Sequence, residues 1–385
     1  MILFDAGGLN GDGSVNVDLD RHGTFEILGR LNKLGNAPLR FSAQPGATVA
    51  IGPAATLEVN DGSVHVDGSG IDPFTDTVGG NSLAVVNNSL TDGFRVIAGN
   101  VRIAGVAGLG RTRVEAAAQL DVAGAPAQQE IFEINGAITV AAMTVGHRLT
   151  GNGTVSGDVI LNSAAVAPND DVLPGFPTPA TLKIGGNLST GLADEVNIDV
   201  DGASGTNDFV DVGGTAALAG ASLTVDPHSH FPSLGLQSLV ILAAGGGVLT
   251  PFATTPNPGD YLGFGIEVQG VNYSLTSVEL NLEQIAYADF NDDGQIDAGD
   301  LATWNSNFPI ASGATHDQGD ADLDGDVDGA DHLVWQRQFG LTVTGQISIT
   351  PFSVPEPTTA ALAGMMFVLV CRERIRAYGH RPTAR

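Results

Sequence analysis

Two stretches of the sequence place oxygen-bearing side chains at the spacing that a hard divalent cation requires. One runs from Asp289 to Asp300, and the other runs from Asp320 to Asp331, 31 residues later. In both, oxygen side chains occupy loop positions 1, 3, 5, 9 and 12, a glycine at position 6 allows a sharp turn, and position 7 offers its backbone carbonyl. The predicted calcium ligands are Asp289, Asn291, Asp293, Gln295, Asp297 and Asp300 for one ion, and Asp320, Asp322, Asp324, Asp326, Asp328 and Asp331 for the other.

The duplication continues past the two loops into two predicted helices. Trp304 and Trp335, the only tryptophans of the chain, each follow the last loop aspartate by four residues, and Phe308 and Phe339 follow it by eight. Residues four apart share one face of a helix. The pattern therefore predicts two calcium loops, each followed by a helix with an aromatic face.

The acidic residues are concentrated in this region. The net charge is −27, and twelve of the 43 acidic residues are aspartates between Asp289 and Asp331, where there is no Lys or Arg. Because these carboxylates would repel one another, metal binding explains them better than an acidic disordered linker, and we expect calcium to fold the segment 286–342. Ile296 is expected to form a small β-contact between the paired loops. The acidic surface argues against nucleic acid and anionic lipid as partners.

Residues 289–340 resemble a type I dockerin, the module that docks onto cohesin domains in polysaccharide-degrading assemblies. The resemblance implies a small α-helical domain of the paired EF-hand type with two calcium ions. Dockerins that bind cohesin usually carry hydroxyl residues at loop positions 10 and 11, where this chain has Ala298-Gly299 and Gly329-Ala330. The expected partner is a cohesin-like protein of unusual surface, and an intramolecular clasp is the alternative.

The chain before this module reads as short β-strands. Apolar stretches of period two, such as Ala47–Ile51 and Ser63–Asp67, recur over residues 1–185 between Gly, Asn and Asp turns. Stacked rungs that bury Val, Ile and Leu on one another explain this pattern. The segment 151–162 resembles rungs of autotransporter-type β-helix passengers, which implies a right-handed β-helix or solenoid, with a β-sandwich array as the alternative. Residues 186–284 have longer strands and are predicted to form an antiparallel β cap over the open strand edges.

The C-terminal tail follows a linker at 343–354. It contains Pro355-Glu-Pro, an apolar run at 358–371 and then three arginines. The run is shorter than the ~20 residues of a membrane-spanning helix, but the basic residues behind it favour a membrane stop over a buried helix. Residues 355–376 resemble the PEP-CTERM sorting signal, which implies export, transient anchoring at the cell envelope and recognition by an exosortase-type enzyme. Since Met1 is not followed by a signal peptide, we expect a leader upstream of it.

Other polar clusters are candidates for catalysis. Asp226-Pro-His-Ser-His230 could supply a metal pair or an acid–base couple, although an ordinary exposed turn between two strands, beside prolines, explains it better. Asp72, Asp76 and His65 could gather on one face of a β-helix, as carboxylates do in polysaccharide lyases and hydrolases. No Ser-His-Asp set, phosphate loop or zinc spacing is present in the sequence. We therefore predict a secreted, non-catalytic surface or matrix protein, with a polysaccharide-degrading β-helix enzyme, a glycoside hydrolase or lyase recruited through its dockerin, as the alternative.

Overall fold

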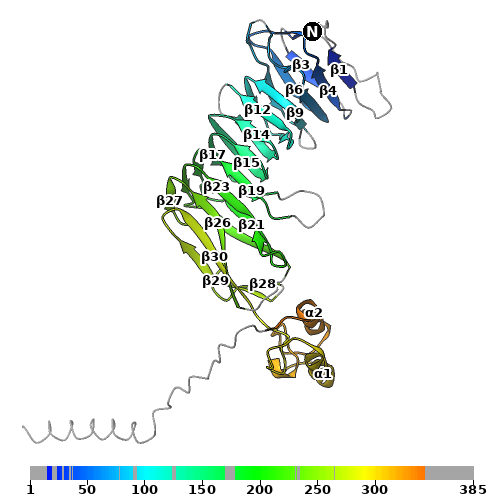
Figure 1. The fold of residues 1–385 in the computed structure, drawn as a ribbon, viewed down its shortest axis with the longest axis vertical. Coiled ribbons are helices and arrows are strands. Elements are labelled where there is room, and N and C mark those ends of the chain that lie inside the picture. Colours follow the sequence, from blue (N-terminus) through cyan, green and yellow to red (C-terminus); the bar gives the residue numbers. More distant parts are fainter. Residues whose placement is uncertain are drawn as a thin grey trace, which may run out of the picture. The chain divides into compact units, whose positions relative to one another are not determined.

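The fold is mainly β, and its strands stack largely in parallel (Figure 1). A computed structural model describes residues 15–19, 24–27, 30–33, 36, 38–77, 79–89, 93–123, 127–169, 178–229, 231, 235–263 and 265–342. The linker at 343–354 and the predicted sorting tail at 355–376 lie outside these residues.

The first stack of parallel strands runs through most of the β-part. Each strand pairs with the next along the stack. Its members are β1 (Val15–Leu19), β4 (Leu39–Ala43), β7 (Ser63–Gly68), β9 (Gly93–Ile103), β11 (Arg111–Val114), β13 (Ala127–Ile134), β15 (Ala142–Gly151), β18 (Ala165–Pro168), β21 (Glu195–Asp201) and β25 (Ser222–Ser229).

Two further stacks complete the rungs. The second joins β9 to β12 (Ala118–Val122), β14 (Ala137–Thr139), β16 (Thr154–Val155), β19 (Thr181–Ile184), β23 (Phe209–Val212) and β26 (Gly235–Ala244). The third joins β13 and β15 to β17 (Asp158–Leu161), β20 (Leu188–Ser189), β24 (Thr215–Ala217) and β27 (Gly247–Thr250). Nearer the N-terminus, β3 (Arg30–Lys33), β6 (Thr56–Val59), β8 (Ala84–Asn87) and β10 (Gly105–Ala107) pair in parallel, as do β2 (Thr24–Ile27) and β5 (Thr48–Ile51). Parallel rungs of this kind define a β-solenoid-like fold and not a β-sandwich array.

The core lies between the stacks and is built by period-two alternation. Phe94, Phe132, Leu149 and Val196 face inward from the first stack, and each of these side chains is fully buried. Stacking such side chains rung on rung stabilises the fold by about 1.5–3 kcal/mol for each one buried. The corners between stacks need glycine: at Gly99, where φ is +67°, a Cβ would lie 2.1 Å from the backbone carbon of Gly68.

Antiparallel pairing begins later in the chain than predicted. Because β21 pairs in parallel with β25, and β23 and β24 pair in parallel with β26 and β27, the parallel rungs continue well past residue 185. The short strand β22 (Thr206–Asn207) is antiparallel to β21, and the later antiparallel strands are β28 (Tyr261–Gly263), β29 (Ile266–Tyr273) and β30 (Ser277–Gln284), with β30 beside β26. The prediction of an antiparallel cap over 186–284 is therefore wrong for its first half, because period-two alternation is the same for both directions of pairing.

The last described segment is helical and has its own small core. It contains α1 (Ala298–Asn307), a 3-10 turn η1 (His316–Gln318) and α2 (Gly329–Gln338). Its core packs the buried side chains of Ala288, Phe290, Ile296, Ala321, Val334 and Leu341, and Val327 is also buried. Among the described residues, none of the helices is long and apolar enough to cross a membrane.

Candidate metal centre

In the first loop, carboxylates turn inward and hold backbone N–H groups. Asp289 Oδ2 accepts a hydrogen bond of 2.9 Å from Gly294 N, whose φ of +81° makes the predicted sharp turn. Asp300 is fully buried, and its Oδ2 accepts a hydrogen bond of 2.7 Å from Asp297 N. Asp297 in turn caps α1 by accepting a bond of 2.6 Å from Gly299 N. The same acidic residues therefore shape the loop and begin the helix that follows it.

The second loop repeats these contacts. Asp320 Oδ2 accepts from Gly325 N at 3.0 Å, and the φ of this glycine is +88°. Asp331, also fully buried, accepts from Asp328 N at 2.7 Å, and Asp328 caps α2. The internal repeat seen in the sequence is thus also a repeat of hydrogen bonds.

The two halves are joined by a reciprocal exchange. Trp304 Nε1 donates to the backbone oxygen of Asp328 at 2.9 Å, and Trp335 Nε1 donates to that of Asp297 at 2.9 Å. The ring of His332 lies between the two indoles, with centroid distances of 4.8 Å to Trp304 and 5.5 Å to Trp335. The sequence predicts the aromatic face of each helix but not these cross-contacts, which bring each tryptophan against the opposite loop.

The expected β-contact between Ile296 and the other loop is not formed. Ile296 instead exchanges backbone bonds with the segment after α2: its N donates to Leu341 O at 3.0 Å, and Gly340 N donates to its oxygen at 2.9 Å. Val327, at the matching position, pairs with Ile310 after α1. This expectation was wrong because the chain after each helix returns to the opposite loop and occupies its backbone groups.

Two groups of carboxylates in the second loop are close enough to share a cation. Asp320, Asp322 and Asp324 form one group, and in each group the ligand atoms lie within 4.8 Å of one another. The other group consists of Asp326, Asp328 and Asp331, so the side chain of Asp326 gathers with two predicted ligands although only its backbone carbonyl was predicted to bind.

The electrostatics of the loops favour a cation. Burial, and then repulsion from Asp331 and Asp324, raise the pKa of Asp322 to about 6. Burial also raises the pKa of Asp289, with repulsion from Asp300 and Asp293 adding to the shift. A bound divalent cation would remove this penalty, because it favours the charged carboxylates.

The donor set suits a hard cation. All predicted side-chain ligands offer oxygen, which is what Ca²⁺ and Mg²⁺ prefer. Asp320 Oδ1 and Asp326 Oδ1 are buried and have no hydrogen-bond partner among the described residues. Buried polar atoms are rarely left without partners, so these two oxygens fit a role as metal ligands.

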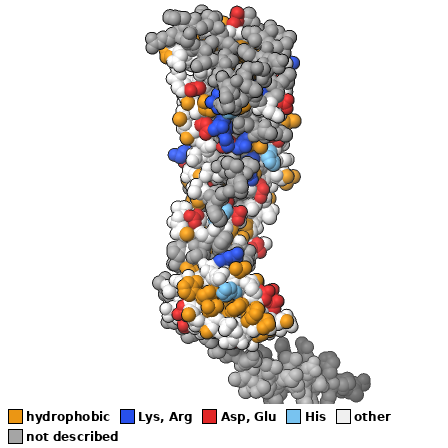
Figure 2. Space-filling view, turned by 90° about the vertical axis from the view of Figure 1, so that its right-hand side faces the viewer, with side chains coloured by type: hydrophobic (Ala, Val, Ile, Leu, Met, Phe, Trp, Pro, Cys, Tyr) orange, Lys and Arg blue, Asp and Glu red, His pale blue; other side chains and the backbone are white. Residues whose placement is uncertain are grey.

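Elsewhere, an Arg–Glu ladder crosses the outward face of the first stack. Arg95 pairs with Glu115 at 2.5 Å, and Arg113 and Arg111 both pair with Glu133, which is 3% exposed at its side chain. Figure 2 shows Lys and Arg side chains gathered on one part of the face in view. The ladder ties successive rungs together through charge pairs that are partly exposed, apart from the buried carboxylate of Glu133.

A cavity of about 290 Å³ is lined by Asp72, Asn100, Arg102, Gln119 and Asp121, among others. Burial raises the pKa of Asp72, although hydrogen bonds oppose the shift. Its carboxylate accepts bonds from Arg102 N at 2.6 Å and from Phe74 N at 2.8 Å. These contacts of Asp72 therefore hold its own turn at Phe74 against the backbone of β9 at Arg102.

The other catalytic candidates from the sequence lie on other parts of the β-solenoid. Asp76 accepts a hydrogen bond from Gly79 N in a turn, and His65 lies on β7. Asp226 and His228 lie within β25 and not in the turn that the prolines suggested, and His230 is outside the described residues.

No protein-family model matches the chain, and the comparison with curated proteins finds no similar one.

Proposed function

We propose that this chain is a secreted, non-catalytic β-solenoid protein of the cell surface or extracellular matrix. In this proposal residues 286–342 bind two calcium ions and act as a dockerin-like docking module. The tail at 355–376 directs sorting by an exosortase-type enzyme, with residues 358–371 as a transient membrane anchor.

The observation that carries the calcium proposal is the matched pair of loops. Each has a buried aspartate at its last position and a positive-φ glycine at position 6. Each also accepts, at a backbone oxygen, a hydrogen bond from the indole N–H of the tryptophan in the other half. Two equivalent loops with oxygen ligands support two equivalent cation sites. Calcium ligation would therefore stabilise the first turns of both helices and also the two tryptophan hydrogen bonds that join the halves.

The docking proposal rests on aromatic side chains at equivalent positions. Phe308 and Phe339 end the two helices and are 48% and 56% exposed, each 5.0 Å from the neighbouring tryptophan ring. The exposed residues at loop positions 10 and 11 carry no hydroxyl groups. A partner for this surface would be a cohesin-like protein with apolar contacts, since apolar and aromatic groups dominate the centres of such interfaces.

Calorimetric titration of the full chain with calcium tests the proposal. We expect two bound calcium ions per chain, and we expect the double variant Asp289→Asn, Asp320→Asn to lose this binding. Asp317→Asn is the matched control, because Asp317 lies in the same acidic stretch but outside both loops. Binding that survives in the double variant, or is absent from the parent chain, contradicts the proposal.

A polysaccharide-degrading enzyme is the second candidate, and the cavity at Asp72 and Asp121 favours it. Two carboxylates beside amide side chains and Arg102 suit a sugar ligand. This alternative predicts that the chain releases reducing ends from a polysaccharide and that Asp121→Asn abolishes the activity. If the parent chain and the variant are equally inactive on neutral and acidic polysaccharides, the enzyme alternative is wrong.

A further inference from the structure

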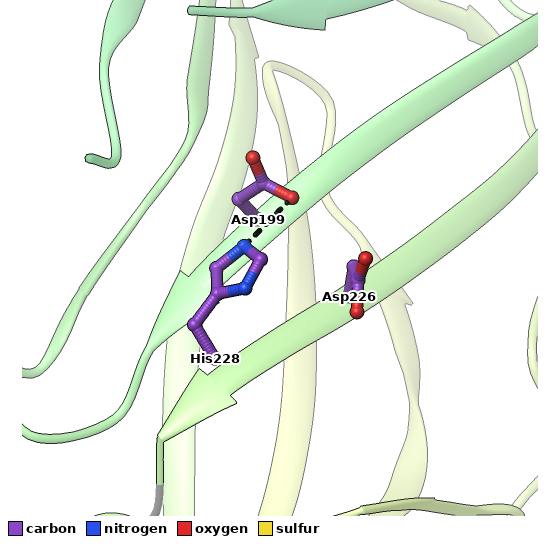
Figure 3. A group of neighbouring side chains, drawn as sticks. All are labelled: Asp199, Asp226 and His228. Carbon is purple, nitrogen blue, oxygen red and sulfur yellow. Dashed lines mark ion pairs between the residues drawn. The ribbon is translucent and has the colours of Figure 1, made fainter. Parts of the chain in front are cut away.

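A mixed cluster of carboxylates and imidazole lies on the β-solenoid, away from the two loops in sequence. Asp199 belongs to β21, and Asp226 and His228 belong to β25. Asp199 lies directly opposite Asp226 in the parallel register, and the register shifts after Val200, which brings His228 beside Asp199 (Figure 3).

The spacing of the ligand atoms is that of a metal site. His228 Nε2 is 3.1 Å from Asp199 Oδ1, and one ligand atom from each of the three residues lies within 4.8 Å of the others. Zinc binds nitrogen and oxygen ligands at about 2.0–2.2 Å, so two ligand atoms at a tetrahedral angle lie about 3.3 Å apart. The His228–Asp199 pair is therefore already close to the separation that one ion would impose.

Burial and local charge also point to a cation. Asp199 is only 8% exposed, whereas Asp226 is exposed and leaves a path for an ion from solvent. A further carboxylate lies close by, because Asp208 Oδ2 accepts a hydrogen bond of 3.2 Å from Asp199 N. A buried carboxylate in such an acidic environment gains from a bound positive charge.

An unpartnered amide oxygen lies on the same face of β21. Asn197 is two residues before Asp199, and its Oδ1 is buried without a hydrogen-bond partner among the described residues. Buried amide oxygens are normally hydrogen-bonded, so this atom could accept a hydrogen bond from water that a bound ion brings to this face.

We propose that Asp199, Asp226 and His228 bind a divalent transition metal ion of the zinc type. The imidazole distinguishes this site from the two loops, whose ligands are all oxygen: nitrogen ligands favour zinc, cobalt or nickel, and oxygen ligands favour calcium or magnesium. The ion would cross-link β21 and β25, two successive strands of the first stack.

Cobalt binding to the untagged full chain in saturating calcium tests this site. Calcium occupies the loops, and Co²⁺ bound through imidazole gives visible absorption that Zn²⁺ abolishes by competition. We expect one tightly bound Co²⁺ per chain, with at least a tenfold weaker affinity in His228→Gln and in Asp199→Asn. His147→Gln is the control, since His147 is exposed on β15 and outside the cluster.

Far-UV circular dichroism shows whether each variant keeps the fold of the parent chain. A folded His228→Gln protein that binds Co²⁺ as the parent does overturns the proposal, as does a parent chain without bound Co²⁺. A His147→Gln protein that loses binding equally also overturns it. Failure of the calcium proposal would leave the part of the Co²⁺ absorption that depends on His228 and Asp199 unaffected, because the two sites share no residues.

Discussion

Raising the pH should destabilise the metal-free module, and calcium should reverse this dependence. The folded-state pKa of Asp322 is raised from 3.8 to about 6 by burial and by neighbouring carboxylates. At a pH between the unfolded pKa of 3.8 and the folded pKa of about 6, Asp322 keeps its proton in the folded chain and loses it in the unfolded chain. The stabilisation from this proton is therefore full below the unfolded pKa and is lost as the pH rises through about 6.

The expected change in the free energy of unfolding depends on the pKa shift of Asp322 and on how far this side chain is exposed to solvent. A shift from 3.8 to about 6 corresponds to about 3 kcal/mol at ~1.36 kcal/mol per pKa unit. Because Asp322 is only partly shielded by its neighbours and remains largely exposed to solvent, screening reduces this to about 1 kcal/mol. Calcium binds only the charged carboxylates, so in its presence the module should be more stable at neutral pH than at acidic pH.

Tryptophan emission of the full chain during urea unfolding measures this effect. Trp304 and Trp335 are the only tryptophans, so the emission reports on the module alone. In a chelator, we expect the free energy of unfolding to be about 1 kcal/mol lower at pH 7 than at pH 4.5. Asp322→Asn should remove most of this difference, and Asp317→Asn should retain it. A free energy that is constant or rises with pH in the chelator refutes the reasoning.

Three substitutions test other parts of the structure. Trp304→Phe removes the bond to Asp328 O and should cost about 1 kcal/mol in urea unfolding, and an unchanged midpoint would mean that the bond contributes nothing. Phe94→Ala opens a cavity in the core of the solenoid and should cost about 3–5 kcal/mol in thermal unfolding followed by circular dichroism, while calcium stoichiometry stays at the parent value. Glu133→Gln removes the buried charge that pairs with Arg111 and should cost about 3 kcal/mol by the same method; a loss below about 0.5 kcal/mol would show that the ladder is dispensable.

Local patterns in the sequence were sufficient to predict many strands. The predicted stretches at 47–51 and 63–67 correspond to β5 and β7. In β5 buried side chains alternate with more exposed ones, as expected for a half-buried strand whatever its partner is, whereas the first four side chains of β7 are all buried. The direction of pairing could not be predicted in this way. The strand that pairs with β21 is distant in the sequence, and the alternation of side chains within β21 is the same for a parallel and an antiparallel partner.

The two acidic loops show the same division. Their predicted turns form at Gly294 and Gly325, since glycine at a fixed position is a local signal. The segment that pairs with Ile296, by contrast, lies some forty residues further along the chain. The pairing of Asp199 with His228 likewise depends on the register of β21 and β25 and on the shift of this register after Val200. No local sequence motif predicts this shift.

Terbium luminescence sensitised by tryptophan tests the central claim most directly. Each indole donates a hydrogen bond to the backbone of one loop, so Tb³⁺ bound in the loops would lie near a tryptophan that can transfer its excitation. The account predicts sensitised emission that saturates at two Tb³⁺ per chain, is displaced by calcium and falls in Trp304→Phe. Absence of sensitised emission, or emission that calcium does not displace, would contradict calcium binding by these loops.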